Sequence, residues 1–147
     1  MLSAPLQILL ADDDENDRLL FIDALKELKT KTIVHTVNDG IELMDYLAKK
    51  DSVLPQLLFL DLNMPRKNGL ECLKEIRSNY GNEIAIAIFS TSLSEKDIDE
   101  TFLNGANVYI NKPNSFDEFK KALNKVLLTA NAYQNTVFNK SNFFLRV

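Results

Sequence analysis

The stretch that decides the fold is Leu57–Gly69, LLFLDLNMPRKNG. Its first four residues are all apolar, which is typical of a central strand of a parallel sheet, buried on both faces. The run ends at Asp61, and the loop after it contains a proline and a glycine, which interrupt regular structure. Apolar residues from Leu70 to Ile76 then recur at helical spacing. The stretch therefore predicts a strand, a polar loop and a helix in succession.

The same alternation extends through the chain on both sides of this stretch. Further apolar runs of strand length are expected at residues 6–11, 33–37, 84–89 and 107–110, each followed by an amphipathic stretch. The last predicted helix runs from about Phe116 to Ala130. Five strand–helix repeats predict an α/β fold, a doubly wound five-stranded parallel sheet with helices on both faces. Right-handed crossovers bring the carboxyl ends of all the strands to one edge, where such sheets bind ligands.

Length and composition limit the number of domains, the partners and the metal sites that this protein can have. The chain has 147 residues, 46% of them apolar, which is enough for one domain. It has 17 basic and 21 acidic residues, so its net charge of −4 makes nucleic acid a poor partner. The single cysteine, Cys72, and the single histidine, His35, exclude an intrachain disulfide and a zinc site of the Cys/His type. Any metal must be held by oxygen.

The amino-terminal sequence does not resemble a targeting signal. It has no basic segment, and its apolar run stops within a few residues at three carboxylates, Asp12–Asp14. Such a run is too short for a signal peptide or a membrane span. We therefore expect a cytoplasmic protein that does not associate with membranes.

Polar residues follow four of the predicted strands, at the edge where ligands bind. They are Asp12-Asp13, Asp61, Ser90-Thr91 and Lys112-Pro113. Carboxylates brought this close repel one another, and a divalent cation such as Mg²⁺, which prefers oxygen ligands, relieves the repulsion. A hydroxyl and an ammonium group beside the cation can donate to an anion. This set suits a phosphoryl group carried on a carboxylate.

Four motifs, in order and each at a strand end, resemble the receiver domain of response regulators in two-component signalling. They are ILLADDDEND, LLFLDLNMPRKNG, IAIFSTS and NVYINKP. The resemblance covers roughly residues 6–130 and implies a sheet of order 2-1-3-4-5. The loop and the short tail are similar to receivers that serve phytochrome-type or other hybrid sensor kinases.

The resemblance also implies an acceptor and a metal site. Asp61 matches the phosphoacceptor, whose carboxylate attacks a phosphohistidine of a partner kinase. Asp13 matches the direct carboxylate ligand of Mg²⁺ or Mn²⁺, and Asp12 acts mostly through a metal-bound water. The Asp61 carboxylate is also a metal ligand, and Asn63 supplies its backbone carbonyl to the metal.

Five further positions match groups that bind or respond to the phosphoryl group. Ser90 and Lys112 match the donors to phosphoryl oxygens, and Tyr109 matches the switch aromatic that turns inward when the serine hydroxyl moves. Thr91 faces the approach to the acceptor, where a small residue is typical. Pro113 is expected to follow a cis peptide bond, since cis is accessible only before proline.

The expected partners are a sensor histidine kinase or phosphotransfer protein and an unknown downstream protein. We expect a receiver domain over residues 1–130 and a short extension over 131–147 with no output domain. The face formed by the fourth helix, fifth strand and fifth helix is the implied contact surface and a possible homodimer interface. The extension is unusually apolar, so we expect it to pack on its own domain or across a homodimer. Its apolar residues are Phe138, Phe143, Phe144, Leu145 and Val147.

Two alternatives come from other functional classes. A phosphatase of the haloacid dehalogenase type has an aspartate nucleophile in a D-x-D motif, which Asp12–Asp14 formally satisfies. The residues expected after that motif, a cap insertion and a late acidic pair are missing, and catalytic turnover of small phosphate esters would distinguish it. A pseudo-receiver that only binds partners would be expected to have lost its acids and lysine, which this chain retains.

Overall fold

The computed structural model describes residues 4–51, 53–133 and 144–145. Strands and helices alternate along the chain in the predicted order. Their bounds are β1 Leu6–Ala11, α1 Glu15–Lys26, β2 Thr32–Val37, α2 Gly40–Ala48, β3 Leu57–Leu60, α3 Gly69–Tyr80, β4 Ala85–Ser90, α4 Glu95–Leu103, β5 Val108–Asn111, α5 Phe116–Tyr133 and β6 Phe144–Leu145. Helix α5 continues past Ala130, where the sequence pattern placed the end of the domain.

The sheet confirms the predicted topology and adds one strand to it. All pairs are parallel, in the order β2-β1-β3-β4-β5-β6, so the first five strands have the expected order 2-1-3-4-5. Strand β6 has two residues and pairs with β5, Phe144 opposite Tyr109 and Leu145 opposite Ile110. Two residues are too few to show strand periodicity in a sequence, so β6 was not predicted. Phe138, Phe143 and Val147 lie outside the described residues.

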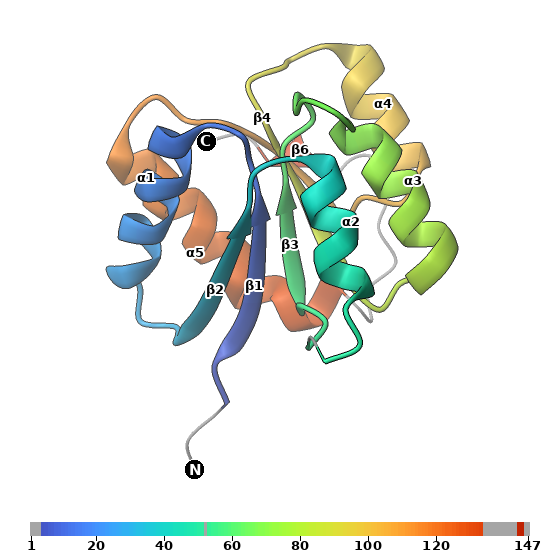
Figure 1. Cartoon of the computed structure of the whole chain (residues 1–147). Helices are drawn as coiled ribbons and strands as arrows, with labels where there is room; N and C mark the ends of the chain where they lie inside the picture. Colours follow the sequence, from blue (N-terminus) through green and yellow to red (C-terminus); the bar gives the residue numbers. More distant parts are fainter. Residues whose placement is uncertain (1–3, 52, 134–143, 146–147) are drawn as a thin grey trace.

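Helices cover both faces of the sheet, as Figure 1 shows, and each face has its own core. Helices α1 and α5 lie on one face, where the rings of Phe21 and Phe119 from the helices pack at steep angles against those of Phe59 and Phe89 from the sheet. Helices α2, α3 and α4 lie on the other face, where Cys72 is fully buried. Every residue of β3 and β4 is buried, as expected for central parallel strands.

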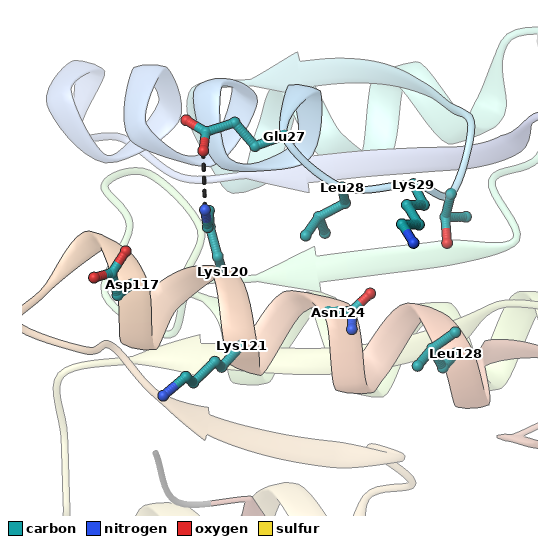
Figure 2. A pocket seen from close by; sticks show the side chains of 9 residues that line it. Glu27, Leu28, Lys29, Asp117, Lys120, Lys121, Asn124 and Leu128 are labelled. Atoms are coloured by element: carbon teal, nitrogen blue, oxygen red, sulfur yellow. Dashed lines mark hydrogen bonds and ion pairs between the residues drawn. The ribbon is translucent and has the colours of Figure 1, made fainter.

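One hollow on the described surface lies away from the carboxyl ends of the strands. It is a groove of about 670 Å³ between the end of α1 and α5, shown in Figure 2, and one ion pair, Glu27 with Lys120, crosses it. None of the predicted site residues lines this groove. Within the described residues, no helix is long and apolar enough to cross a membrane.

Candidate phosphorylation and metal site

The end of β1 places one aspartate inside the molecule and the next at its rim. Asp12 is fully buried, and its Oδ1 accepts a hydrogen bond from the Asp14 N–H at 2.9 Å. The Arg18 guanidinium donates to the Asp12 carbonyl at 2.9 Å. Asp14 instead caps α1, accepting from the Asp17 N–H at 3.0 Å. Asp13, between them, is exposed.

The loop after β3 holds Asp61 in place from its backbone. Asp61 is 5% exposed, and its Oδ1 accepts from the Asn63 N–H at 3.2 Å. The loop closes where the Gly69 N–H donates to the Leu62 carbonyl at 3.0 Å. A Cβ at Gly69 would lie 2.2 Å from the Asp61 carbonyl oxygen, so only glycine allows the two ends of the loop to come this close. The NMPRKNG loop therefore fixes both the acceptor and its neighbour Asn63.

Three carboxylates meet at this edge of the sheet. One oxygen from each of Asp12, Asp13 and Asp61 lies within 4.8 Å of the others. Burial raises the pKa of Asp61 to about 6, although Lys112 opposes the shift, and burial also raises the pKa of Asp12. Ionised acids in this position need positive charge beside them. Oxygen ligands at this spacing fit a hard divalent cation such as Mg²⁺ or Mn²⁺.

Lys112, which follows β5, is surrounded by acids. Its Nζ lies 2.9 Å from Asp12 Oδ2, 2.7 Å from Asp17 Oδ2 and 3.5 Å from Asp61 Oδ2. Burial alone would lower the pKa of Lys112, but hydrogen bonds to Asp17 and Asp12 and the charge of Asp61 raise it above its usual value. The ammonium also lies 5.2 Å from the centre of the Phe89 ring. Lys112 is therefore charged and directed into the carboxylate cluster.

The predicted hydroxyl and switch residues are joined through the loop after β4. Ser90 is fully buried, and its Oγ accepts from the Ser92 N–H at 3.1 Å. Tyr109 is fully buried in the adjacent strand, and its hydroxyl donates to the Ser92 carbonyl at 2.8 Å. Ser92 Oγ donates in turn to Asp97 of α4 at 2.6 Å. Thr91 is exposed. Ser92 thus contacts the hydroxyl residue, the aromatic residue and α4.

A family model described as the response regulator receiver domain matches residues 8–124. The chain belongs to this family. The receiver domain is 33% identical over 125 residues to the response regulator Rcp1 of Synechocystis, covering 80% of this chain and 83% of the relative. It is 30% identical over 126 residues to the probable methanogenesis regulatory protein FilR2 of Methanothrix harundinacea, covering 83% and 81%.

Solved structures of receiver domains have the same fold. The phosphorylated cyanobacterial phytochrome response regulator RcpA superposes with a TM-score of 0.80 at 31% identity, covering 88% of this chain and 96% of that one. The Mn²⁺-bound form of Rcp1 superposes with a TM-score of 0.77 at 26% identity, covering 92% and 99%. Receiver domains of this family are signalling domains of two-component systems.

One expectation for this receiver domain is wrong. The Lys112–Pro113 peptide bond is trans, like every peptide bond of the described residues. The trans form before proline is favoured by about 0.5–1 kcal/mol, and no local feature of the sequence reverses that preference. With the trans bond, the Lys112 N–H donates to the Ser90 carbonyl at 2.8 Å, and the Lys112 ammonium contacts Asp12. The backbone and the side chain of Lys112 are therefore both positioned without a cis bond.

Two residues of the receiver site, Asp17 and Ser92, are missing from the sequence prediction. Asp17 lies in the first turn of α1, where an acidic residue is ordinary because it faces the positive end of the helix dipole. Its partner Lys112 lies 95 residues further along the chain, so no local pattern marks the contact. Ser92 acts partly through its backbone carbonyl, which has no sequence signature.

Proposed function

We propose that this receiver domain accepts a phosphoryl group on Asp61 from a histidine kinase or phosphotransfer protein, with Mg²⁺ or Mn²⁺ as its cation. The observation that carries the proposal is the convergence of Asp61 with Asp12, Asp13 and Lys112. Family membership supports the same chemistry, and relatives have been solved in phosphorylated and Mn²⁺-bound forms. An isolated surface acid would have neither the adjacent ammonium nor the second and third carboxylates.

Each residue of the site has a separate role in phosphoryl transfer. An Asp61 carboxylate oxygen attacks phosphorus, the bond between phosphorus and the donor histidine breaks, and an acyl phosphate forms. The Lys112 ammonium and the Ser90 hydroxyl donate to the phosphoryl oxygens. Asp13, Asp61, the Asn63 carbonyl and, through water, Asp12 would hold the cation. When bound, the cation supplies the positive charge that offsets repulsion between the carboxylates and the incoming phosphoryl oxygens.

The phosphoryl group would change the molecule through the loop after β4. A Ser90 hydroxyl drawn toward the phosphoryl group alters its 3.1 Å contact with the Ser92 N–H. The Ser92 carbonyl holds the Tyr109 hydroxyl, and its side chain holds Asp97 of α4. This path links Asp61 to the inward position of Tyr109 and to α4, a local charge event that biases a two-state element. Thr91 lies on the approach to the acceptor and influences how long the phosphoryl group survives.

The surface affected by this path is the face formed by α4, β5 and α5. We assign to it the contact with a downstream protein or a second copy of the chain. Leu103, at the end of α4, is 78% exposed and offers apolar surface to such a partner. Strand β6 lies against β5 on the same side, so Phe144 and Leu145 share this face with any partner.

The test is labelling by a small phosphodonor. Incubation with acetyl phosphate and Mg²⁺ should add one phosphoryl group to the intact mass, and Asp61→Ala should abolish the gain. Asp45→Ala, which removes an exposed carboxylate of α2, is the matched control and should be labelled normally. Labelling that survives Asp61→Ala, or that needs no divalent cation, would overturn the proposal.

The same assay separates the two alternatives. A pseudo-receiver would show no mass gain at all. A phosphatase of the haloacid dehalogenase type would release phosphate over many turnovers, whereas a receiver is labelled about once per molecule. Family membership over residues 8–124 favours the receiver over the phosphatase.

A further inference from the structure

The closest acid to Lys112 is not the proposed acceptor but Asp17. Lys112 Nζ is 2.7 Å from Asp17 Oδ2 and 3.5 Å from Asp61 Oδ2, with Asp12 Oδ2 at 2.9 Å. A lysine ammonium has three N–H donors and no acceptor. Two of them are taken by Asp17 and Asp12 at full hydrogen-bond distance. The contact with Asp61 is the loosest of the three.

Asp17 is held over the site by the first turn of α1. Its N–H donates to Asp14 at 3.0 Å, which fixes the backbone of this turn. The next residue, Arg18, donates to the Asp12 carbonyl at 2.9 Å and ties the turn to the end of β1. The Asp17 side chain is 32% exposed, compared with 7% for Asp61 and 0% for Asp12. Asp17 therefore reaches the ammonium from the solvent side of the cluster.

Asp17 has no place in the phosphoryl-transfer chemistry described above, and it adds a negative charge to the site. A phosphoryl group on Asp61 replaces one negative charge by nearly two. The phosphorylated state therefore needs the Lys112 ammonium more than the unphosphorylated state does. A carboxylate that holds the ammonium at 2.7 Å opposes this need in two ways, by occupying a donor and by repelling the phosphoryl oxygens.

We propose that Asp17 competes with the phosphoryl group for the Lys112 ammonium and thereby favours the unphosphorylated form of the receiver. The inference rests on the proposed function, because it needs Asp61 to be the acceptor. Asp17 is a positioning residue in this scheme, since it acts through Lys112. Its partial exposure limits the size of the effect, because solvent screens an ion pair at the rim.

The expected effect is faster labelling when the carboxylate is removed. With acetyl phosphate as donor, the bond between phosphorus and the acetate oxygen breaks, acetate leaves, and the bond between phosphorus and Asp61 forms. We expect Asp17→Asn to raise the rate constant of this step about three- to fivefold at low ionic strength. Asp17→Glu keeps a carboxylate in reach of Lys112 and should restore a rate close to that of the wild type.

Glu15→Gln is the matched control. Glu15 lies in the same turn of α1, is exposed, and has no ion pair among the described residues, so the substitution removes the same charge without touching Lys112. The rate is measured by intact mass at low and high ionic strength for all four proteins, with Mg²⁺ saturating. The advantage of Asp17→Asn over Glu15→Gln should shrink at high ionic strength, which a purely structural change would not produce.

The outcomes distinguish this inference from the proposed function. A labelled wild type with Asp17→Asn equal to or slower than Glu15→Gln overturns the role of Asp17 alone. A faster Asp17→Asn whose advantage is unaffected by salt, or which Asp17→Glu shares, also overturns it. A wild type that is not labelled at all overturns both. Melting curves of the four proteins confirm that the comparison is made between folded molecules.

Discussion

At the scale of single residues, the site has acidic side chains in the protein interior, where a charged group is destabilising. Asp12 and Asp61 are almost fully buried, and burial raises the pKa of both. Lys112 and backbone N–H groups offset part of this cost but not all of it. The remaining free-energy cost can be reduced by a bound cation or a phosphoryl group, because either changes the charge balance of the cluster. The free energy of unfolding is therefore lower than it would be with uncharged side chains at these positions.

We therefore expect Asp61→Asn to stabilise the metal-free protein at pH 7.5. With a pKa of about 6 in the folded state and about 3.9 in the unfolded state, Asp61 binds a proton more tightly when folded. Its contribution to stability is therefore present at low pH and is lost as pH rises through about 4 to 6. The amide avoids this loss, so we expect a gain of about 1–3 kcal/mol in the free energy of unfolding.

Urea unfolding at pH 7.5 and pH 5.5, without divalent cations, measures this gain. The advantage of Asp61→Asn should be smaller at pH 5.5, where the wild type is partly protonated. Added Mg²⁺ should stabilise the wild type more than the variant, since the variant lacks one ligand. A variant less stable than the wild type at pH 7.5 would contradict the argument.

At the scale of elements, one arginine joins the ends of several of them. Arg77, near the end of α3, donates to the carbonyls of Gly105, Gly81 and Ile84 and to the Asn107 side chain, at 2.8–2.9 Å. Burial lowers the pKa of its guanidinium to about 10. These bonds fix the loops that lead into β4 and β5, the two strands that end at Ser90 and precede Lys112.

We predict that Arg77→Ala lowers the free energy of unfolding by about 2–4 kcal/mol. Partly buried carbonyls of Gly105 and Ile84 lose their donors, and an unpaired buried polar group costs about 1–3 kcal/mol. Arg77→Lys should recover little, because an ammonium cannot reproduce the planar fork of donors. Lys74→Ala, on the exposed side of α3, is the control and should change stability by less than about 0.5 kcal/mol. Thermal and urea unfolding of the three variants check this.

The loop after β3 packs against the start of α2. A Cβ at Gly40 would lie 2.1 Å from the Lys67 carbonyl oxygen, so the loop backbone rests directly on the glycine. Beside it, Arg66 NH1 lies 3.6 Å from Asp39, the N-cap of α2. The position of the loop that carries Asn63 therefore depends on a residue in another element.

Gly40→Ala should lower stability by about 1–3 kcal/mol, because the new methyl group displaces backbone. Helix propensity alone predicts the opposite sign, since alanine is favoured over glycine in a helix by about 1 kcal/mol. Amide chemical shifts of residues 61–68 should move in the variant, and its Mg²⁺ affinity should fall. A variant that is more stable than the wild type would show that the loop does not rest on Gly40.

At the scale of the whole molecule, local patterns predicted the topology but not the contacts between distant elements. The apolar strands and the acids at their ends were sufficient to predict a parallel sheet and to bring Asp12, Asp13 and Asp61 together, as the structure confirms. Asp17 reaches Lys112 across 95 residues of sequence, and no local pattern marks that pair. The isomer of the Lys112–Pro113 bond likewise depends on tertiary context, and β6 depends on an edge that only the folded sheet provides.

The carboxy-terminal strand β6 covers one edge of the sheet. Strand β6 pairs with β5 beside Tyr109 and Ile110, at an edge that would otherwise have unpaired backbone groups. Removing residues 134–147 should therefore lower the melting temperature or change the proportion of dimer, since the open edge of β5 is free to pair elsewhere. Leu145→Pro should have part of the same effect, because proline cannot donate a ladder hydrogen bond, while Leu145→Ala, which keeps the backbone N–H, is the control. Melting curves and sedimentation velocity measure both properties. If the truncated protein matches the full chain in melting and in sedimentation, β6 does not stabilise this edge of the sheet.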